Sequence, residues 1–363
     1  DPNEGSLGSV NIVRLVLSIG LLLTVGLGGC SDKGPTGPTS QVDYSFYGID
    51  NLDSRRVLRF QPSTGIIDTV GEDFPQLLRT NVSANGQLLY LDLADSVGVF
   101  DSESGALLRS LPYRSSVTAF SPDGKYVVLS KNGALRILRL PTYQLVLADD
   151  TSHFGGAVFS INSKDIYSVG VSSTGSGTSI KHLRICPMGT IEERSIPAMP
   201  GALIQVAPSI DQKLLFLYSR WDSFGCSFGV YDVHGDSLIY RTDFSPGGGW
   251  IVVSPDGRNV FFTNPGTLLI PPQPPPSAFY IYDIPSNTVH EVSTFGLAGD
   301  PSERDNMPVG PMAITPDGKT LVLARAVIGN DLVVFDVPSK RITKYCYFNN
   351  QAFFYDITCQ TGR

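Results

Sequence analysis

Short runs dominated by apolar residues recur along the chain, and glycine, proline, asparagine or aspartate bounds most of them. The run from Tyr126 to Leu129 follows the turn sequence Ser121-Pro-Asp-Gly-Lys125. Pro122 presets φ for the second position of a tight turn, and Gly124 accepts the left-handed conformation that a side chain resists. The pattern therefore predicts a β-hairpin whose second strand begins at Tyr126.

Copies of this turn make it the unit of an internal repeat. Direct copies are Ser254-Pro-Asp-Gly-Arg258 and Thr315-Pro-Asp-Gly-Lys319, and Ser83-Ala-Asn-Gly-Gln87 is a looser one. An apolar run follows each of them. The repeat therefore covers most of the chain.

The spacing of the turn glycines predicts two further, degraded copies. Gly86 and Gly124 are 38 residues apart, whereas the 133 residues from Gly124 to Gly257 are enough for three units. Asn162-Ser163 stands where Asp-Gly stood in one degraded copy. The other, Ala207-Pro-Ser-Ile-Asp-Gln-Lys213, keeps the Asp and Lys around a one-residue insertion and places its turn at Gln212.

A second pattern completes each unit. After the turn and its strand comes a strand that ends in Asp, followed by another turn and another strand, as in Gly98-Val-Phe-Asp101, Gly229-Val-Tyr-Asp232, Tyr280-Ile-Tyr-Asp283 and Val333-Val-Phe-Asp336. The low charge (17%), the 37 Gly and 26 Pro and the lack of helical periodicity indicate an all-β protein. Four strands in about 40 residues are the period of a β-propeller blade.

These motifs resemble those of the YVTN or YncE-like family of bacterial WD40-like propellers. The resemblance covers Asp43 to Arg363 and rests on Ser-Pro-Asp-Gly-Lys, a strand, and then Val-Phe-Asp or Val-Tyr-Asp. It implies the fold and says little about function, since similar proteins serve as surface, redox-associated and binding proteins. The Trp221-Asp222 dipeptide lies before the third strand of its blade, so the repeat is not an orthodox WD40 repeat.

The number of blades follows from the two ends of the repeat region. The first strands, Ser45 to Ile49 and Arg56 to Phe60, have no turn motif before them. The C-terminal run from Phe353 aligns with Val117 to Lys125, so that Gly362 and Arg363 match Gly124 and Lys125. We therefore expect the last strand to complete the first blade as its innermost strand and to close the ring. Turns at Gly86, Gly124, Ser163, Gln212, Gly257, Gly318 and Gly362 predict a seven-bladed propeller with four antiparallel strands per blade, over residues 43–363.

The N-terminal segment, residues 1–29, is interpreted as a cleaved targeting sequence. Arg14 precedes an apolar run from Leu15 to Leu27, too short for a comfortable transmembrane helix, and the run ends in Leu27-Gly-Gly-Cys30. This ending resembles the lipobox of a bacterial lipoprotein, in which Cys30 carries lipid; a short anchor helix with an incidental Cys is the alternative. Residues 30–42 are rich in Gly, Pro, Ser and Thr and predict a flexible tether.

The expected location is the bacterial cell envelope. Ser31 after the lipidated Cys resembles outer-membrane retention, which leaves the outer membrane, the periplasm and the cell surface open. Beyond Cys30 the four cysteines are compatible with two disulfides in an oxidising compartment. Cys346 with Cys359 would staple the closing strand, and Cys186 with Cys226 is the leftover pair; buried thiols are the alternative.

Candidate binding residues lie in the loops between blades and between the second and third strands of a blade, which we call the loop face. Propellers commonly bind ligands there, at the mouth of the central channel. The candidates are Arg79, Arg114, His153, Arg220, Trp221, Trp250, Arg304 and Asp305. Aromatic and Arg side chains are common anchors of recognition surfaces. For Trp250, which begins an inner strand, packing between blades is the competing explanation.

Catalytic signals are poor. The four histidines, His153, His182, His234 and His290, have no metal-ligand spacing, and no nucleophile elbow or phosphate loop is present. His182 and His290 lie in or beside strands, where a structural role is ordinary. His153, in an inter-blade loop near Asp149 and Asp150, is the one of interest. No cofactor or metal is expected, and the net charge of −7 without a basic stripe argues against nucleic acid.

The sequence therefore predicts a monomeric, lipid-anchored propeller that binds or scaffolds a protein, peptide or glycan through its loop face. The alternative is a propeller enzyme, a lactonase or lyase, with its chemistry at the central channel. That alternative requires convergent Glu, His and Arg side chains, for which the sequence has only scattered candidates. A redox subunit is disfavoured because no haem or quinone attachment motif is present.

The lipid anchor has a direct test. In cells fed radioactive palmitate, the chain should take up label, and Cys30→Ser should abolish it because the only thiol next to the predicted cleavage site is gone. A Cys186→Ser protein is the matched control and should label normally. Label retained by Cys30→Ser would contradict the anchor.

Overall fold

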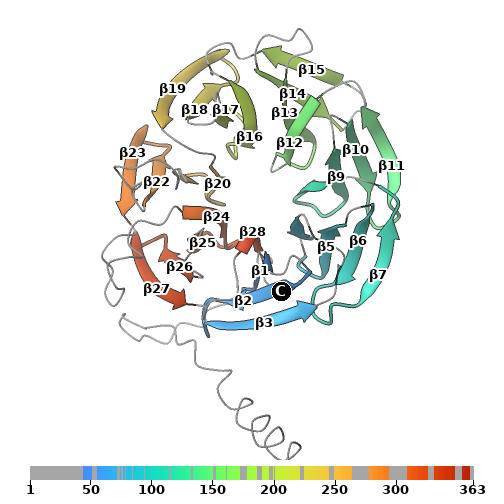
Figure 1. The fold of residues 1–363 in the computed structure, drawn as a ribbon. Coiled ribbons are helices and arrows are strands. Elements are labelled where there is room, and N and C mark those ends of the chain that lie inside the picture. Colours follow the sequence, from blue (N-terminus) through green and yellow to red (C-terminus); the bar gives the residue numbers. More distant parts are fainter. Residues whose placement is uncertain are drawn as a thin grey trace, which may run out of the picture.

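In the part of the chain that it describes, the computed structural model contains 28 strands, which form seven four-stranded antiparallel sheets. The seven sheets are arranged around a central axis as the blades of a propeller (Figure 1). The predicted all-β, seven-bladed fold is therefore confirmed. The described residues are 44–50, 55–71, 74, 77, 79–83, 85–93, 95–113, 116–131, 134–149, 153–160, 162–171, 178–185, 190–195, 199, 201–220, 225–244, 249–263, 278–293, 309–325, 331–347 and 354–359.

The strands are numbered along the chain, and each blade is given from its innermost to its outermost strand. Blade 1 is β28 (Phe354–Cys359), β1 (Phe46–Asp50), β2 (Val57–Gln61) and β3 (Ile66–Gly71). Blade 2 is β4 (Thr80–Val82), β5 (Leu88–Asp92), β6 (Val97–Asp101) and β7 (Leu107–Leu111). Blade 3 is β8 (Ser116–Phe120), β9 (Tyr126–Lys131), β10 (Ala134–Arg139) and β11 (Gln144–Asp149). Blade 4 is β12 (His153–Phe159), β13 (Asp165–Val171), β14 (Thr178–Arg184) and β15 (Thr190–Ser195).

The remaining three blades follow the same order. Blade 5 is β16 (Ala202–Pro208), β17 (Leu214–Arg220), β18 (Cys226–Asp232) and β19 (Ser237–Phe244). Blade 6 is β20 (Ile251–Val253), β21 (Asn259–Thr263), β22 (Ala278–Asp283) and β23 (Thr288–Ser293). Blade 7 is β24 (Val309–Ile314), β25 (Thr320–Arg325), β26 (Asp331–Asp336) and β27 (Arg341–Tyr347). No helix among the described residues has the length and apolar character needed to cross a bilayer.

The inner turns, which join the first and second strands of blades 2 to 7, are all built around one buried hydroxyl. In blade 3 the Ser121 hydroxyl donates to Asp123 Oδ1 at 2.7 Å and accepts the amide of Tyr126 at 2.8 Å. Asp123 Oδ1 also accepts the amide of Lys125 at 3.1 Å. The same bonds recur at Ser83, Ser160, Ser209, Ser254 and Thr315.

The inner turns also confirm the predicted degraded copies. In all six described inner turns, the third residue after the turn serine or threonine is in the left-handed conformation, with φ between 59° and 71°. These residues are Gly86, Gly124, Ser163, Gln212, Gly257 and Gly318. Ser163 and Gln212 adopt this conformation without glycine. The predicted one-residue insertion is wrong, because Ser209 to Lys213 has the same length and bonds as Ser121 to Lys125. Gly362 lies outside the described residues.

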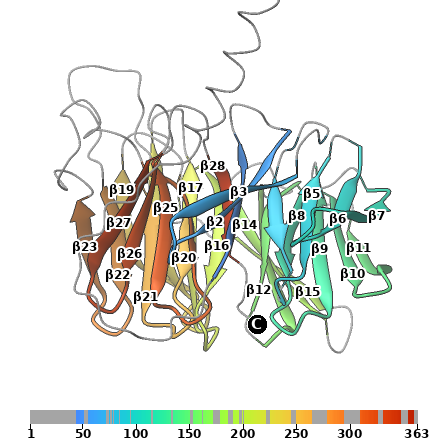
Figure 2. The same ribbon diagram turned by 90° about the horizontal axis from the view of Figure 1, so that it is seen from below.

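The outer turns, which join the third and fourth strands, explain the repeated Asp at the end of the third strand. Asp101 Oδ1 accepts the amides of Glu103 at 3.2 Å and Ser104 at 2.7 Å. The side chains of Asp232, Asp283 and Asp336 accept turn amides in the same way. Since strand direction alternates within a blade, the inner and outer turns share one face of the propeller, which we call the turn face, at the lower edge of Figure 2.

The C-terminal strand β28 is the innermost strand of blade 1, as predicted. It pairs antiparallel with β1, with Phe46 opposite Cys359 and Tyr47 opposite Thr358. It also packs beside β24 of blade 7 and β4 of blade 2. Blade 1 thereby consists of both ends of the described chain (Figure 1).

The core lies between neighbouring blades rather than in one central cluster. One apolar cluster joins Val128 and Ile137 of blade 3 to Phe159 and Leu183 of blade 4, and similar clusters join the other neighbours. Polar clamps reinforce these interfaces. Between blades 7 and 1, the buried Lys344 donates from Nζ to the carbonyl oxygens of Pro62 at 3.3 Å and Ser63 at 3.4 Å.

Replacing the inner-turn hydroxyl should destabilise the propeller. Ser121→Ala leaves the amides of Lys125 and Tyr126 without their side-chain acceptor, so we expect a loss of about 1 to 3 kcal/mol in the free energy of unfolding, measured by urea titration. Ser121→Thr should lose much less, because Thr315 makes the same bonds in blade 7. The control is Ser110→Ala at an exposed position of β7. A loss no larger than that of the control would contradict this role.

Candidate functional site

The strand ends on the loop face of blades 5 and 6 bring two of the predicted binding positions, Arg220 and Trp250, into one sector. β17 ends at Arg220, which pairs with Cys226 at the start of β18, and Cys226 pairs in turn with Phe244 at the end of β19. Trp250 directly precedes β20 of blade 6. Residues 221–224, 245–248 and 264–277, which connect these strand ends, lie outside the described residues. The boundary between blades 5 and 6 is therefore the best-supported candidate site.

A buried tyrosine fixes this boundary. The Tyr218 hydroxyl lies 2.8 Å from Sγ of Cys226 in its own blade and donates to the carbonyl oxygen of Thr263 in blade 6 at 3.3 Å. Burial, together with the nearby Cys226 thiol, raises the pKa of Tyr218. The phenol is therefore neutral and holds the two blades together as a hydrogen-bond donor.

Gly249 is required by the close approach of Tyr218. A Cβ at Gly249 would overlap both the carbonyl oxygen of Thr263 and the ring of Tyr218. The next residue, Trp250, is held by two bonds to Thr263: the Trp250 amide donates to Thr263 Oγ1 at 3.2 Å, and its carbonyl accepts the Thr263 amide at 3.2 Å. The two bonds to Thr263 and the close packing of Tyr218 on Gly249 therefore fix the backbone at Trp250.

The Trp250 side chain packs mainly as a structural residue. It is half-buried and lies against the apolar cluster between blades 6 and 7, which includes Phe261, Met312 and Phe335. The sequence left packing between blades as the competing explanation for Trp250, and this contact is such packing. Trp250 therefore contributes a partly exposed edge to the loop face rather than a free-standing anchor.

Aromatic rings fill the interior below this sector. Phe228 of blade 5 stacks on Phe262 of blade 6 at 4.1 Å between ring centroids, and Phe262 stacks on Tyr280 at 5.3 Å. Tyr280 is half-buried, and its pKa is raised by burial and by the charge of Glu291. Stacked aromatic pairs stabilise a fold beyond the burial of their surface area, so the stack forms a rigid apolar base under the strand ends.

The other predicted binding residues belong to other sectors or lie outside the described residues. Arg79 is exposed on the loop face where the chain passes from blade 1 to blade 2, and its carbonyl accepts the amide of Asp92 at 3.1 Å. His153 is the first residue of β12 rather than part of a loop. The side chains of His153 and Arg220 are not described, and neither are Arg114, Trp221, Arg304 and Asp305. The structure thus unites only part of the predicted set.

A buried ion pair accounts for Asp149, which the sequence placed near His153. Lys181 Nζ of blade 4 lies 3.4 Å from Asp149 Oδ2 of blade 3, and both side chains are about nine-tenths buried or more. Because breaking a buried pair leaves a charge without its counterion, this contact locks the two blades together. Asp149 is therefore committed to a structural contact.

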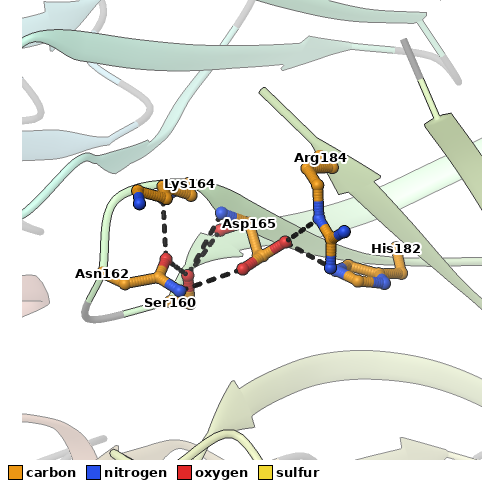
Figure 3. A network of polar contacts seen from close by, with 6 residues as sticks. All are labelled: Ser160, Asn162, Lys164, Asp165, His182 and Arg184. Atoms are coloured by element: carbon orange, nitrogen blue, oxygen red, sulfur yellow. Dashed lines mark hydrogen bonds and ion pairs between the residues drawn. The ribbon is translucent and has the colours of Figure 1, made fainter. Parts of the chain in front are cut away.

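A second polar network, around Asp165 on the turn face of blade 4, was not anticipated from the sequence (Figure 3). Asp165 Oδ1 lies 2.9 Å from His182 Nε2 and accepts Arg184 Nε at 3.3 Å, while Oδ2 accepts Asn162 Nδ2 at 3.0 Å. Burial opposes ionisation, but the bonds from Asn162, His182 and Arg184 outweigh it and lower the pKa of Asp165.

The Asp165 network has a structural explanation. The His182 ring stacks on Tyr167 at 4.9 Å, and Asn162 belongs to the inner turn in which Ser163 replaces glycine. The network ties this turn to β13 and β14 and supports its left-handed residue. The structural role predicted for His182 is confirmed. Within the described ranges, no three or more His, Cys, Asp or Glu side chains come together in a way that could hold a metal ion.

Both predicted disulfides are wrong. Cys226 and Cys359 carry thiols. Cys359 is on the innermost strand of blade 1, whereas Cys346 is on the outermost strand of blade 7. The blade architecture separates these two positions, whereas Cys186 lies outside the described residues.

Comparison with known proteins supports the fold alone. No protein-family model and no curated protein matches the chain. Among solved structures, a functionally unknown protein from Desulfotomaculum acetoxidans is 15% identical, with 88% of this chain and 100% of that chain covered and a TM-score of 0.62. Kuenenia stuttgartiensis hydrazine synthase is 16% identical, with coverages of 73% and 77% and a TM-score of 0.58.

A third structural neighbour is the dihydro-heme d1 dehydrogenase NirN in complex with DHE, which is 14% identical, with coverages of 96% and 86% and a TM-score of 0.56. These neighbours differ in their named functions. The chain is therefore a seven-bladed, WD40-like β-propeller similar to propellers of bacterial proteins, and the neighbours assign no activity to it.

The fit of Gly249 against Tyr218 can be tested by mutation. Gly249→Ala should shift the tryptophan fluorescence and lower the free energy of unfolding by about 1 to 3 kcal/mol, because the added methyl must displace Tyr218 or the backbone at Trp250. Tyr218→Phe keeps the ring, so it should lose stability with little spectral shift. An unchanged spectrum and stability for Gly249→Ala would contradict the close approach.

Proposed function

We propose that the chain is a lipid-anchored binding module of the bacterial cell envelope, which recognises a protein, peptide or glycan through the loop face of blades 5 and 6. The lipobox-like ending at Cys30 and the YVTN-like repeat motifs support this assignment. The lipid on Cys30 would hold the propeller at the membrane, and the tether after it would leave the propeller free to engage a ligand.

One contrast supports this location for the binding surface. On the turn face, the repeated Ser, Asp and Asn side chains form hydrogen bonds within their own turns, as Ser121 and Asp123 do. On the loop face of blades 5 and 6, Tyr218 and the stacked rings of Phe228, Phe262 and Tyr280 form a rigid base. Non-repetitive segments that contain both tryptophans of the chain are attached to that base.

Such a base suits recognition for a physical reason. Binding costs free energy when loops must be ordered, and a rigid support for part of the surface reduces that cost. Trp and Arg are also the residues that most often dominate binding energy. The segment with Arg220 and Trp221 combines these side chains with strands that Tyr218 and Cys226 hold in place.

Site-specific photo-crosslinking in cells tests this function. A benzophenone amino acid at Trp221 should give a discrete crosslinked product with an envelope protein, peptide or glycan. The same amino acid at Lys125, on the turn face, is the matched control and should not give that product. Trp250→Ala in the Trp221 probe strain should weaken the product. Identical products from both positions, or none from Trp221, would contradict a loop-face binding site.

A further inference from the structure

The outermost strand of each blade pairs with a strand on one side only, so its other edge lies at the rim of the propeller. Such an edge presents a row of backbone N–H and C=O groups to which another chain can pair. Natural proteins commonly guard these edges with charged side chains. In blade 3 the strand at the rim is β11 (Figure 1). The side chains of the outermost strands therefore decide which edge is open to a partner.

β11 is an outer strand without an exposed charge. The charged residue in its sequence, Gln144-Leu-Val-Leu-Ala-Asp149, is Asp149, which is buried in the ion pair with Lys181. Leu145 of the same strand is 46% exposed. The other outer strands contain Asp68, Arg109, Arg241, Asp243, Glu291 and Arg341 as exposed charged residues, and β15 has Glu192, Glu193 and Arg194 in its sequence. A bulge in β11 is matched by bulges in β3, β7, β19 and β27, so charge is what sets β11 apart.

The apolar residues of β11 continue the interface between blades 2 and 3 out to the rim. Leu145 lies opposite Leu138 of β10, and Leu138 packs in the same apolar cluster as Val99 of blade 2. The exposed Ala148 lies opposite Arg136, two residues before Leu138 on β10, so it shares this side of the sheet with Leu145. A strand added beside β11 would therefore place alternate side chains next to Leu145 and Ala148.

The charges beside β11 are positive. At the end of the third strand, where other blades have the repeated Asp of the outer turn, blade 3 has Arg139, since the amide of the next residue makes the same bond to the inner turn. Arg136 and Arg139 both lie opposite residues of β11. The guanidinium of Arg109 in blade 2 lies 4.9 Å from the ring centroid of Tyr143, which directly precedes β11. Among the described residues, the Arg139 side chain has no hydrogen-bond or ion-pair partner.

The carboxylates of blade 3 are already bound to cations. Asp149 is paired with Lys181, and Asp123 lies 3.2 Å from Nζ of Lys125 in the inner turn. The range 116–149 contains four Lys or Arg and two Asp residues, in a chain whose net charge is −7. The rim of blade 3 therefore has a charge that complements carboxylates rather than cations.

We propose that the edge of β11 binds an extended peptide segment of a partner protein, which carries carboxylates among apolar residues and adds a fifth strand to blade 3. In this mode of recognition, backbone hydrogen bonds supply affinity and alternate side chains supply specificity. Leu145 and Ala148 contact apolar side chains of the segment, and Arg109, Arg136 and Arg139 attract its carboxylates. A second copy of this chain fits less well, because a two-fold pairing of β11 brings the arginines of both copies together.

Fluorescence anisotropy with short peptides tests the strand addition. The probe is fluorescein-labelled acetyl-Glu-Val-Glu-Val-Glu-Val-Glu-amide, which should bind the full chain saturably. The same peptide with Lys in place of each Glu should bind at least about tenfold more weakly, because several charge contacts become repulsive. A third peptide, N-methylated at the central Glu-Val-Glu, keeps every side chain but loses backbone donors on both of its edges. It should not bind, since strand addition depends on those donors.

A matched pair of variants locates the site. Leu145→Asp removes an apolar contact and places a carboxylate against those of the probe, so it should weaken binding at least about tenfold. Ile239→Asp makes the same change on β19, where Ile239 is also 46% exposed, and should bind as the parent does. Arg139→Gln is a milder change that removes one exposed charge and should weaken binding about two- to fivefold. Thermal unfolding checks that each variant folds.

The outcomes separate this site from the loop face. Failure to bind the Glu peptide, equal binding of the Lys or N-methylated peptide, or equal loss in Leu145→Asp and Ile239→Asp would overturn the proposal. A dimer in analytical ultracentrifugation that Leu145→Asp dissociates and Ile239→Asp leaves intact would identify a second copy as the occupant and would overturn it too. None of these results depends on lipid at Cys30 or on a ligand at the loop face, so palmitate labelling and loop-face crosslinking remain independent tests.

Discussion

The hydroxyl of the inner-turn serine or threonine is the interaction on which the rest of the fold depends. The residue that carries it is buried in blades 2 to 7, and removing the hydroxyl leaves the strand amide without its side-chain acceptor, which costs about 1 to 3 kcal/mol. The hydroxyl in turn donates to the turn Asp or Asn, which orients that side chain toward the next amide. These bonds set the register between the two innermost strands, and the same geometry recurs in blades 2 to 7.

Once each blade has this geometry, neighbouring blades meet through apolar faces and a few polar clamps. Inner strands with β-bulges leave backbone groups that the neighbouring blade satisfies: Asn81 donates to the Val117 carbonyl at 2.9 Å, and Asp92 accepts the Val117 amide at 2.9 Å. At the outer radius, Lys344 bonds to the blade 1 turn across a separation of more than 280 residues. Such contacts join the blade that contains both chain ends to its neighbours.

The sequence predicted the repetitive part of this architecture because each repeated residue has a local task. The spacing of the repeat located the turns at Ser163 and Gln212, although neither residue is the expected glycine. These turns form because the serine three residues earlier, Ser160 or Ser209, makes the same bonds as in the other blades. The Asp165 network was missed because it joins residues 17 to 19 positions apart that match no repeat. The disulfides were wrong because cysteine spacing carries no information about which strand of a blade, or which end of it, a residue occupies.

The candidate site was harder to predict for the same reason. The closeness of Tyr218, Gly249 and Thr263 depends on how blades 5 and 6 pack, and only Gly249 carried a local signal, as part of a glycine run before Trp250. From the sequence alone, that run is also typical of a flexible linker. The structure assigns the glycine to a steric requirement instead, since a phenol and a carbonyl occupy the space of its side chain. A position that breaks the repeat in order to fit a neighbouring blade is shaped by tertiary packing, and such positions on the loop face are where a ligand surface can vary without loss of the blade.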